Sequence, residues 1–220
     1  MKAAFQGEAK RIRDLLQNGE AAPTTLATAF YATPSAEWDH WLDLVWDIDG
    51  VPEDGAELPR GCVPYIPCPA STVHEALQQA AVTRDDVFVD VGSGAGRVAF
   101  LAHLLTGSAS IGLEIQSDLV RAAQGRANWL NLTRLRFVHG DAAALVRFVP
   151  LGTVFFLYCP FGVARLRELL RGLEDIARTK QIRVCCVDMP PLTCSWLVRH
   201  PSSSSQVDVY RSTLHRQTAG

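Results

Sequence analysis

Short, continuous apolar runs alternate, from residue 69 onward, with segments whose apolar residues recur every three or four positions. Runs without polar interruption predict strands that are buried on both faces, whereas the three-to-four spacing predicts helices. Strands that alternate with helices form a parallel sheet with helices on both sides. The expected strands span residues 87–91, 110–115, 135–139, 154–158 and 182–187, and the clearest helix spans residues 162–177.

The end of the chain breaks this alternation. Two apolar segments, residues 196–199 and 206–211, follow each other with only a serine-rich stretch between them, which predicts an antiparallel hairpin. We therefore expect an α/β fold with a doubly wound, mostly parallel seven-stranded sheet. Ligands of such sheets bind beyond the carboxyl ends of the strands, where the strand order reverses. The residues that end each strand are thus the candidates for a site.

The first 60 residues follow another pattern. We expect residues 1–60 to form an N-terminal helical cap, and residues 61–220 to form the main domain. One short amphipathic helix is predicted to end near Gly19, and a second to span residues 35–48.

Two further helix starts carry capping signals. Thr72 and Glu75 have the spacing of a capping box, which predicts that a helix begins at Thr72. Ser117 is expected to cap a helix that extends to about Leu130.

The first predicted strand ends in the sequence D-V-G-S-G-A-G-R, residues 90–97. Glycines allow a tight turn and let a ligand approach the backbone, and the helix that follows offers free N–H groups. Acids end or follow the neighbouring strands: Glu114 lies 24 positions after Asp90, and Asp141 follows the third strand. A carboxylate at Glu114 can accept hydrogen bonds from both hydroxyls of a ribose, and one at Asp141 can accept a hydrogen bond from an adenine amine.

A dinucleotide-dependent dehydrogenase is the competing nucleotide-binding interpretation. Its fingerprint also requires an acid about 20 residues beyond the glycines, which Glu114 satisfies. That fingerprint is G-x-G-x-x-G, however, and position 97 is arginine. It also gives no role to Asp90 or Asp141.

The combination of glycine loop and acids resembles the class I S-adenosylmethionine-dependent methyltransferases over about residues 60–217. The resemblance implies that S-adenosylmethionine is the cofactor. It places Asp90 and the loop at the methionine end, Glu114 at the ribose, and Asp141 and Ala142 at the adenine. Ile115, next to Glu114, is also expected to contact the cofactor. The loop residues expected to contact the cofactor are Gly92, Ser93, Gly94 and Gly96.

A narrower resemblance begins upstream of the loop. The segment P-Y-I-P-C-P, residues 64–69, followed by a helix and then by D-x-G-S-G-x-G-R, is similar to the mitochondrial lysine methyltransferases of the ATP synthase c-subunit and their bacterial relatives. In that group the upstream segment lies over the cofactor, which implies contacts from Tyr65 and Thr72. Cys68 stands where the group usually has threonine.

The fourth predicted strand ends in Y-C-P-F-G, residues 158–162, where class I enzymes place acceptor residues. Tyr158 is expected to contact the cofactor and to orient an acceptor amine through its hydroxyl, and Phe161 is expected to wall the pocket beside Pro160. Tyrosine in place of the usual Asp or Asn argues against methylation of adenine or glutamine. Cys159 precedes the proline, whereas cytosine-C5 methyltransferases use Pro-Cys with a cysteine nucleophile.

Two tryptophans of the predicted cap, Trp38 and Trp41, leave two interpretations open. They pack in the core, or they line a lid and stack on a planar or cationic acceptor.

Composition limits the kinds of partner that the protein is expected to bind. The 220 residues include 21 Lys and Arg against 23 Asp and Glu, a net charge of −2, which argues against strong general binding to nucleic acid. No apolar run is long enough for a transmembrane helix, and no signal peptide is evident, so we expect no membrane insertion. The six cysteines form no C-x-x-C pair, and no metal site is expected. Reduced thiols predict a cytoplasmic protein.

These observations favour a methyltransferase whose acceptor is a protein or a small molecule. The resemblance implies N-methylation of a lysine amine on a protein. Two alternatives stay open: a small-molecule N-, O- or C-methyltransferase of secondary metabolism, and a non-catalytic module that binds S-adenosylmethionine.

Overall fold

A computed structural model describes residues 2–49, 58, 62–158, 162–201, 204 and 206–214. Its helices are α1 Lys2–Gln17, α2 Pro23–Ala32, α3 Trp38–Trp46, α4 Ala70–Gln79, α5 Arg97–Thr106, α6 Ser117–Trp129, α7 Ala142–Leu145 and α8 Val163–Ala177. Its strands are β1 Val87–Val91, β2 Ala109–Glu114, β3 Leu135–His139, β4 Val154–Tyr158, β5 Arg183–Val187, β6 Leu197–Arg199 and β7 Val207–Ser212.

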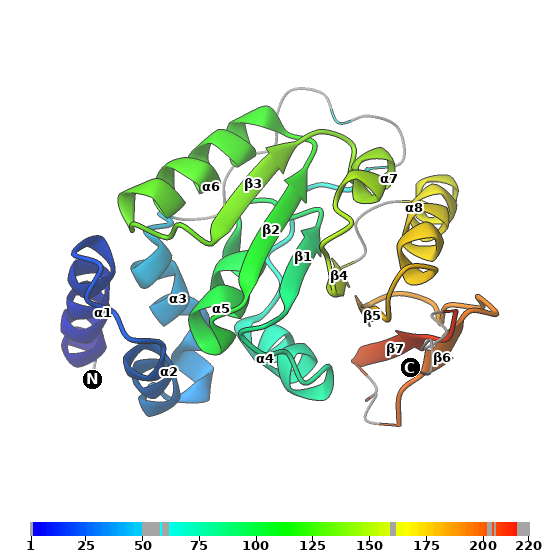
Figure 1. The fold of residues 1–220 in the computed structure, drawn as a ribbon. Coiled ribbons are helices and arrows are strands. Elements are labelled where there is room, and N and C mark those ends of the chain that lie inside the picture. Colours follow the sequence, from blue (N-terminus) through cyan, green and yellow to red (C-terminus); the bar gives the residue numbers. More distant parts are fainter. Residues whose placement is uncertain are drawn as a thin grey trace.

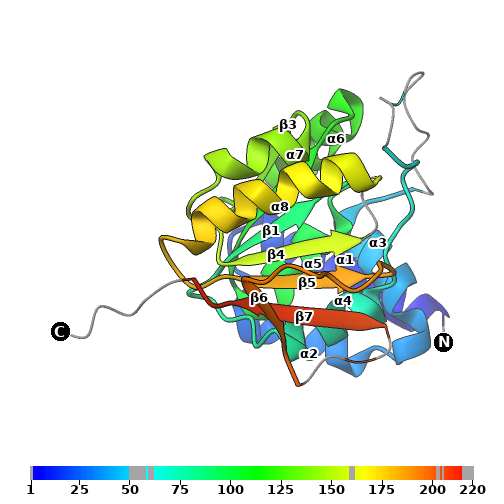
Figure 2. The same ribbon diagram turned by 90° about the vertical axis from the view of Figure 1, so that its right-hand side faces the viewer.

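The strands form one seven-stranded sheet in the order β3-β2-β1-β4-β5-β7-β6 (Figure 1). Strands β1 to β5 are parallel, and β7 pairs antiparallel with both β5 and β6. Figure 2 shows β7 and β6 side by side beyond β5, as the predicted terminal hairpin requires. The predicted doubly wound, mostly parallel Rossmann-like fold is confirmed. The strand order reverses between β1 and β4, which places the expected ligand site there.

The two faces of the sheet are covered unequally. Alternate residues of each strand point to opposite faces, so that Phe88 packs with α1 to α6 and its neighbour Val89 packs with α7 and α8. In Figure 1 helices α1 to α3 gather on the opposite side of the molecule from α8. The central strands β1 and β4 are nearly continuous apolar runs because both of their faces are covered, whereas the edge strand β3 is exposed on one face.

The N-terminal helices share their core with the sheet domain. Helix α2 was not expected from the sequence, and a short 3-10 turn, Ser35–Glu37, precedes α3. Trp46 is fully buried and stacks on Phe100 of α5, with ring centroids 4.3 Å apart. Helix α3 therefore packs against the sheet-covering helices rather than standing apart from them.

Both predicted helix starts need correction. Helix α4 begins at Ala70, and Pro69 is its N-cap, so Thr72 lies within the first turn and caps nothing. The backbone N–H of Ala70 donates instead to the Asp39 carboxylate, at 3.0 Å. Gln116 rather than Ser117 is the N-cap residue of α6, although no side chain caps that end.

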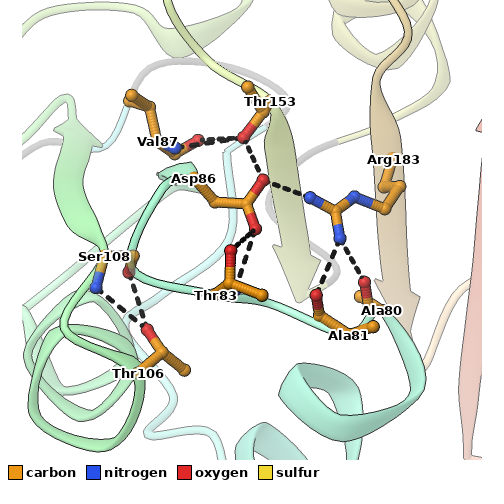
Figure 3. Close-up of polar contacts among 9 residues, drawn as sticks. All are labelled: Ala80, Ala81, Thr83, Asp86, Val87, Thr106, Ser108, Thr153 and Arg183. Atoms are coloured by element: carbon orange, nitrogen blue, oxygen red, sulfur yellow. Dashed lines mark hydrogen bonds and ion pairs between the residues drawn. The ribbon is translucent and has the colours of Figure 1, made fainter.

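A buried ion pair ties together the amino-terminal ends of β1, β4 and β5 (Figure 3). Asp86, just before β1, pairs with Arg183, the first residue of β5. The same carboxylate accepts from the Thr153 hydroxyl at 2.8 Å and from the backbone N–H of Thr83 at 2.8 Å. Arg183 also donates to the carbonyl of Ala81, at 3.0 Å. This network pairs the buried carboxylate of Asp86 with the Arg183 guanidinium, at the edge of the sheet opposite the expected ligand site.

Among the described residues, no helix combines the length and the apolar character that crossing a bilayer requires.

Candidate active site

A cavity of about 300 Å³ opens at the carboxyl ends of β1, β2, β4 and β5. It lies at the point where the strand order reverses, as the sequence predicted. Its polar lining comes from the ends of these strands and from the loops that follow them. The lining residues in the described part of the chain are Leu58, Cys62, Val63, Pro64, Tyr65, Ile66, Gly92, Leu113, Glu114, Ile115, Gln116, Asp141, Ala142, Tyr158 and Asp188.

The glycine loop, residues 92–96, meets this cavity at Gly92. Gly92, Gly94 and Gly96 all have positive φ, at 81°, 50° and 85°, a conformation that side chains with a Cβ rarely adopt. The Gly94 N–H donates to the Glu114 carboxylate at 2.8 Å, and the Trp46 indole N–H donates to the carbonyl of Ala95 at 2.8 Å. The loop is therefore held by the second strand on one side and by α3 on the other.

The Tyr65 ring lies directly on the glycine loop. A Cβ placed on Gly94 would come within 2.1 Å of Tyr65 Cδ2, so only glycine permits this contact. Burial raises the pKa of the Tyr65 hydroxyl to about 12, which keeps it protonated as a hydrogen-bond donor. The upstream segment thus contacts the glycine loop.

Two acids of the cavity are already engaged in the fold. Glu114 is buried, and its other oxygen accepts from the Gln116 N–H at 2.8 Å. Asp141 caps α7 by accepting from the Ala143 N–H at 3.1 Å, and it forms an ion pair with Arg165. Both carboxylates keep free lone pairs on the cavity side, because a carboxylate accepts up to four hydrogen bonds.

Asp90 differs from these acids because it is buried without a full set of partners. Its Oδ2 atom has no hydrogen-bond partner among the described residues, and the side chain is 2% exposed. Burial raises the pKa of Asp90 to about 8, and the nearby Glu114 adds to the rise, while the Ala99 backbone N–H opposes it. Asp90 does not line the cavity itself but lies two residues before Gly92, which does. An unsatisfied buried carboxyl in this position fits a ligand that brings a hydrogen-bond donor or a positive charge.

Asp90 should make the stability of the ligand-free protein depend on pH. The pKa is raised in the folded state, so the stabilising contribution is complete below the unfolded pKa near 4 and is lost as pH rises toward 8. We expect an Asp90→Asn variant to gain free energy of unfolding relative to wild type as pH rises from about 5 to 8. Chemical denaturation across this range measures the difference. An exposed Asp118→Asn variant should show no such trend, and a pH-independent difference for Asp90→Asn would contradict the raised pKa.

Arg97 fastens the glycine loop to the cap and to the upstream segment. Its side chain is 6% exposed, and it pairs with Asp39 at 2.9 Å and with Asp43 at 2.6 Å, both on α3. Its guanidinium also donates to the carbonyl of Cys68 at 3.4 Å. Since Asp39 in turn accepts from the Ala70 N–H, one arginine joins three segments that surround the cavity.

An Arg97→Met variant should lose about 2 kcal/mol of unfolding free energy. Methionine keeps the aliphatic packing but leaves two carboxylates without their cation. This loss of unfolding free energy is smaller than the loss expected for a fully buried ion pair, because the side chains of Asp39 and Asp43 are 51% and 35% exposed. Urea denaturation measures the change. Arg121→Met, which removes an ion pair exposed on both sides, is the matched control and should cost less than about 1 kcal/mol.

The acceptor side of the cavity is formed by the ends of β4 and β5. Tyr158 is half-buried at the last position of β4 and pairs in register with Val187, so Asp188 follows on the next strand. Pro160 and Phe161, expected to wall the pocket, lie outside the described residues, as does Cys159. Asp188 also lines the cavity, and its position one residue beyond the end of β5 is the sequence signal for it. Within the described ranges, no three His, Cys, Asp or Glu side chains gather in an arrangement able to hold a metal ion.

Several expected site residues do not line the cavity. Trp41 is fully buried, and Trp38 stacks on Phe30 with centroids 4.4 Å apart, so the structure places both indoles in the aromatic packing of the cap. Thr72 is buried in α4. Gly96 serves packing, since a Cβ there would come within 2.6 Å of the Phe137 ring. Ser93 is buried, and its hydroxyl has no partner in the described part of the chain.

Comparison with known proteins gives matches to methyltransferases. Residues 83–149 match a family described as methyltransferase domain. A protein-lysine N-methyltransferase of Saccharolobus islandicus is 36% identical over 62 residues, which are 28% of this chain and 38% of that protein. The chain thus aligns with little more than a third of that relative.

Solved structures share the fold. An RNA methyltransferase from Salinibacter ruber, in complex with S-adenosyl-L-homocysteine, is 25% identical with a TM-score of 0.50, covering 69% of this chain and 95% of its own. The putative methyltransferase yhhF from Escherichia coli is 21% identical with a TM-score of 0.53, covering 75% of this chain and 92% of its own.

Proposed function

We propose that this chain, which carries a class I S-adenosylmethionine-dependent methyltransferase domain, N-methylates an amine, with a lysine side chain on a protein as the acceptor. The observation that carries the proposal is the charge of the cavity. Glu114, Asp141 and Asp188 line it, and no lysine or arginine side chain is among its described lining residues, although Arg165 pairs with Asp141 from outside the lining. Such a lining favours a cationic cofactor together with an acceptor that arrives as an ammonium ion.

The cofactor supplies a methyl group activated by a positively charged sulfur. The residues present fit it. Asp90 offers an unsatisfied buried oxygen to the amino group at the methionine end, and Glu114 offers free lone pairs to the ribose hydroxyls. Asp141 and Ala142, which line the same cavity, would hold the adenine, Ile115 would contact the cofactor beside Glu114, and Tyr65 would cover the cofactor from the side of the loop. The role of the protein is then to align the acceptor nitrogen with the methyl carbon and to exclude water.

The proposal of lysine as the acceptor rests on the charge of the cavity and on one relative. The matched Saccharolobus protein is named a protein-lysine methyltransferase, which supports the assignment to lysine. Among the structural neighbours is an RNA methyltransferase, so RNA is the rival acceptor. The net charge of −2 and the acidic cavity both oppose a polyanionic acceptor. Membership of the group of lysine methyltransferases that act on the ATP synthase c-subunit stays a prediction, which rests on the upstream segment alone.

Transfer of a labelled methyl group tests the function. Purified protein would be incubated with S-adenosylmethionine labelled in its methyl group and with an extract from a strain that lacks the gene. We expect label in macromolecules that is released by protease and resists nuclease, and that is recovered as methyllysine after hydrolysis.

Each other outcome contradicts the lysine assignment in its own way. Label that nuclease releases would make RNA the acceptor, and label among small metabolites would favour the small-molecule alternative. Absence of label, with binding of S-adenosylhomocysteine confirmed by calorimetry, would favour a non-catalytic binding module.

A further inference from the structure

We infer that a second, smaller cavity beside the cofactor cavity receives the acceptor side chain as a primary alkylammonium, and that Asp188 binds its charged end. This inference rests on the proposed methyltransferase function. The second cavity has a volume of about 190 Å³. Its described lining residues are Cys186, Asp188, Met189, Pro190, Gln206 and Asp208.

The sheet topology explains why the two cavities adjoin. Strand β7 runs antiparallel to β5, so the start of β7 lies beside the end of β5, with Val187 opposite Val207. Asp188 is the first residue beyond β5 and lines both the cofactor cavity and the second cavity. A group bound at Asp188 is therefore next to the space in which the cofactor is expected, and close to Tyr158 at the end of β4.

The two carboxylates of the second cavity are not equivalent. Asp208 is 16% exposed and already paired, because Arg199 Nε donates to it at 2.6 Å and the Tyr210 hydroxyl donates at 3.3 Å. The carboxylate of Asp188 makes no hydrogen bond or ion pair with the residues that the structure describes. Asp188 therefore contributes an uncompensated negative charge where the two cavities meet, which favours a cation over a neutral or anionic group.

The remaining lining suits the stem of such a cation. Met189 and Pro190 supply the smaller, apolar part of a lining that is otherwise polar, next to the Asp188 charge. A lysine side chain has this combination of an aliphatic stem and a compact ammonium that donates three hydrogen bonds. A phosphate-bearing acceptor would instead bring negative charge toward Asp188 and Asp208.

The transfer step balances without a further reactant. The bound ammonium first loses one proton to water, which frees the nitrogen lone pair. That lone pair forms the new N–C bond, the C–S bond breaks, and its electron pair stays on sulfur. Asp188 binds and orients the amine; it is not required to accept the proton.

The conformation of Asp188 makes a conservative test available. Its φ is 50°, in the left-handed region, which asparagine tolerates nearly as well as aspartate. Asp188→Asn therefore removes the charge while keeping shape and backbone. Asp85→Asn is the matched control, because Asp85 is exposed at the opposite edge of the sheet and its replacement removes the same charge.

The experiment measures binding rather than turnover. Each protein is first titrated with S-adenosylhomocysteine by calorimetry, and then, at saturation, with n-butylammonium or n-butanol while NMR shifts of the protein are followed. We expect wild type and Asp85→Asn to bind butylammonium in preference to butanol. At saturating S-adenosylhomocysteine, Asp188→Asn should bind butylammonium about tenfold more weakly than wild type and Asp85→Asn do.

The outcomes separate the two proposals. Equal binding of butylammonium and butanol by wild type, no binding of either, or an unchanged affinity in Asp188→Asn would overturn the acceptor subsite while leaving the cofactor site intact. Failure of wild type to bind S-adenosylhomocysteine would instead overturn the proposed function itself.

Discussion

A Gly94→Ala variant should bind S-adenosylmethionine about a hundredfold more weakly than wild type, or not at all, while the fold persists. Two causes add. The residue has φ of 50°, which costs a side chain with a Cβ about 1–2 kcal/mol. The new methyl group would also lie 2.1 Å from the Tyr65 ring, so either the ring or the loop must leave its place beside the cavity. Calorimetric titration with S-adenosylhomocysteine measures the loss.

Two further variants identify the cause. Gly125 lies in α6, and a Cβ added there would have no neighbouring atom within 4 Å, so Gly125→Ala should leave binding unchanged and raise stability by up to about 1 kcal/mol. Adding Tyr65→Leu to Gly94→Ala removes the ring that clashes, and part of the affinity should return. Wild-type affinity in Gly94→Ala would exclude the loop from the cofactor site.

An Arg183→Met variant should lose about 3–5 kcal/mol of unfolding free energy. It leaves the Asp86 carboxylate, whose side chain is 11% exposed, without its cation among the contacts of Figure 3. It also leaves the carbonyls of Ala80 and Ala81 without their shared donor. Denaturant unfolding followed by circular dichroism measures the change. If the methionine variant does not fold, Arg183→Lys, which keeps the charge, should fold with a smaller loss.

Exposed charge pairs provide the comparison for this network. Arg178→Met breaks an ion pair with Glu174 on the surface of α8 and should cost less than about 1 kcal/mol. Asp86→Asn combined with Arg183→Met should cost less than the sum of the single changes, because the second change then removes a charge that has already lost its partner. Additive losses would show that the pair is not coupled.

The strands could be predicted almost to the residue because their environment is simple. Val87–Val91, Leu135–His139 and Val154–Tyr158 begin and end where expected. For the two central strands, β1 and β4, the apolar run and the burial on both faces coincide. Chain topology then brought Asp90, Glu114 and Asp141 to one edge without any knowledge of side-chain contacts.

Features set by distant contacts could not be predicted. Helix α2 carries apolar and small residues around its circumference, so no single face marks it. The start of α4 depends on Asp39, which lies 31 positions earlier and takes the capping role that local sequence gave to Thr72. Likewise, nothing near Arg97 in the sequence indicates its carboxylate partners on α3, and the sequence does not show that Asp188 shares one cavity with Asp208.

The contacts that fix the glycine loop have a consequence for the thermodynamics of ligand binding. Hydrogen bonds to Glu114 and from Trp46, together with the Tyr65 ring, fix the loop before any ligand arrives. A ligand that docks on a loop already in its bound shape gives up little backbone entropy in the protein. Association with this loop should therefore be dominated by favourable enthalpy, and its change in heat capacity should reflect the apolar surface covered by the ligand rather than a folding transition.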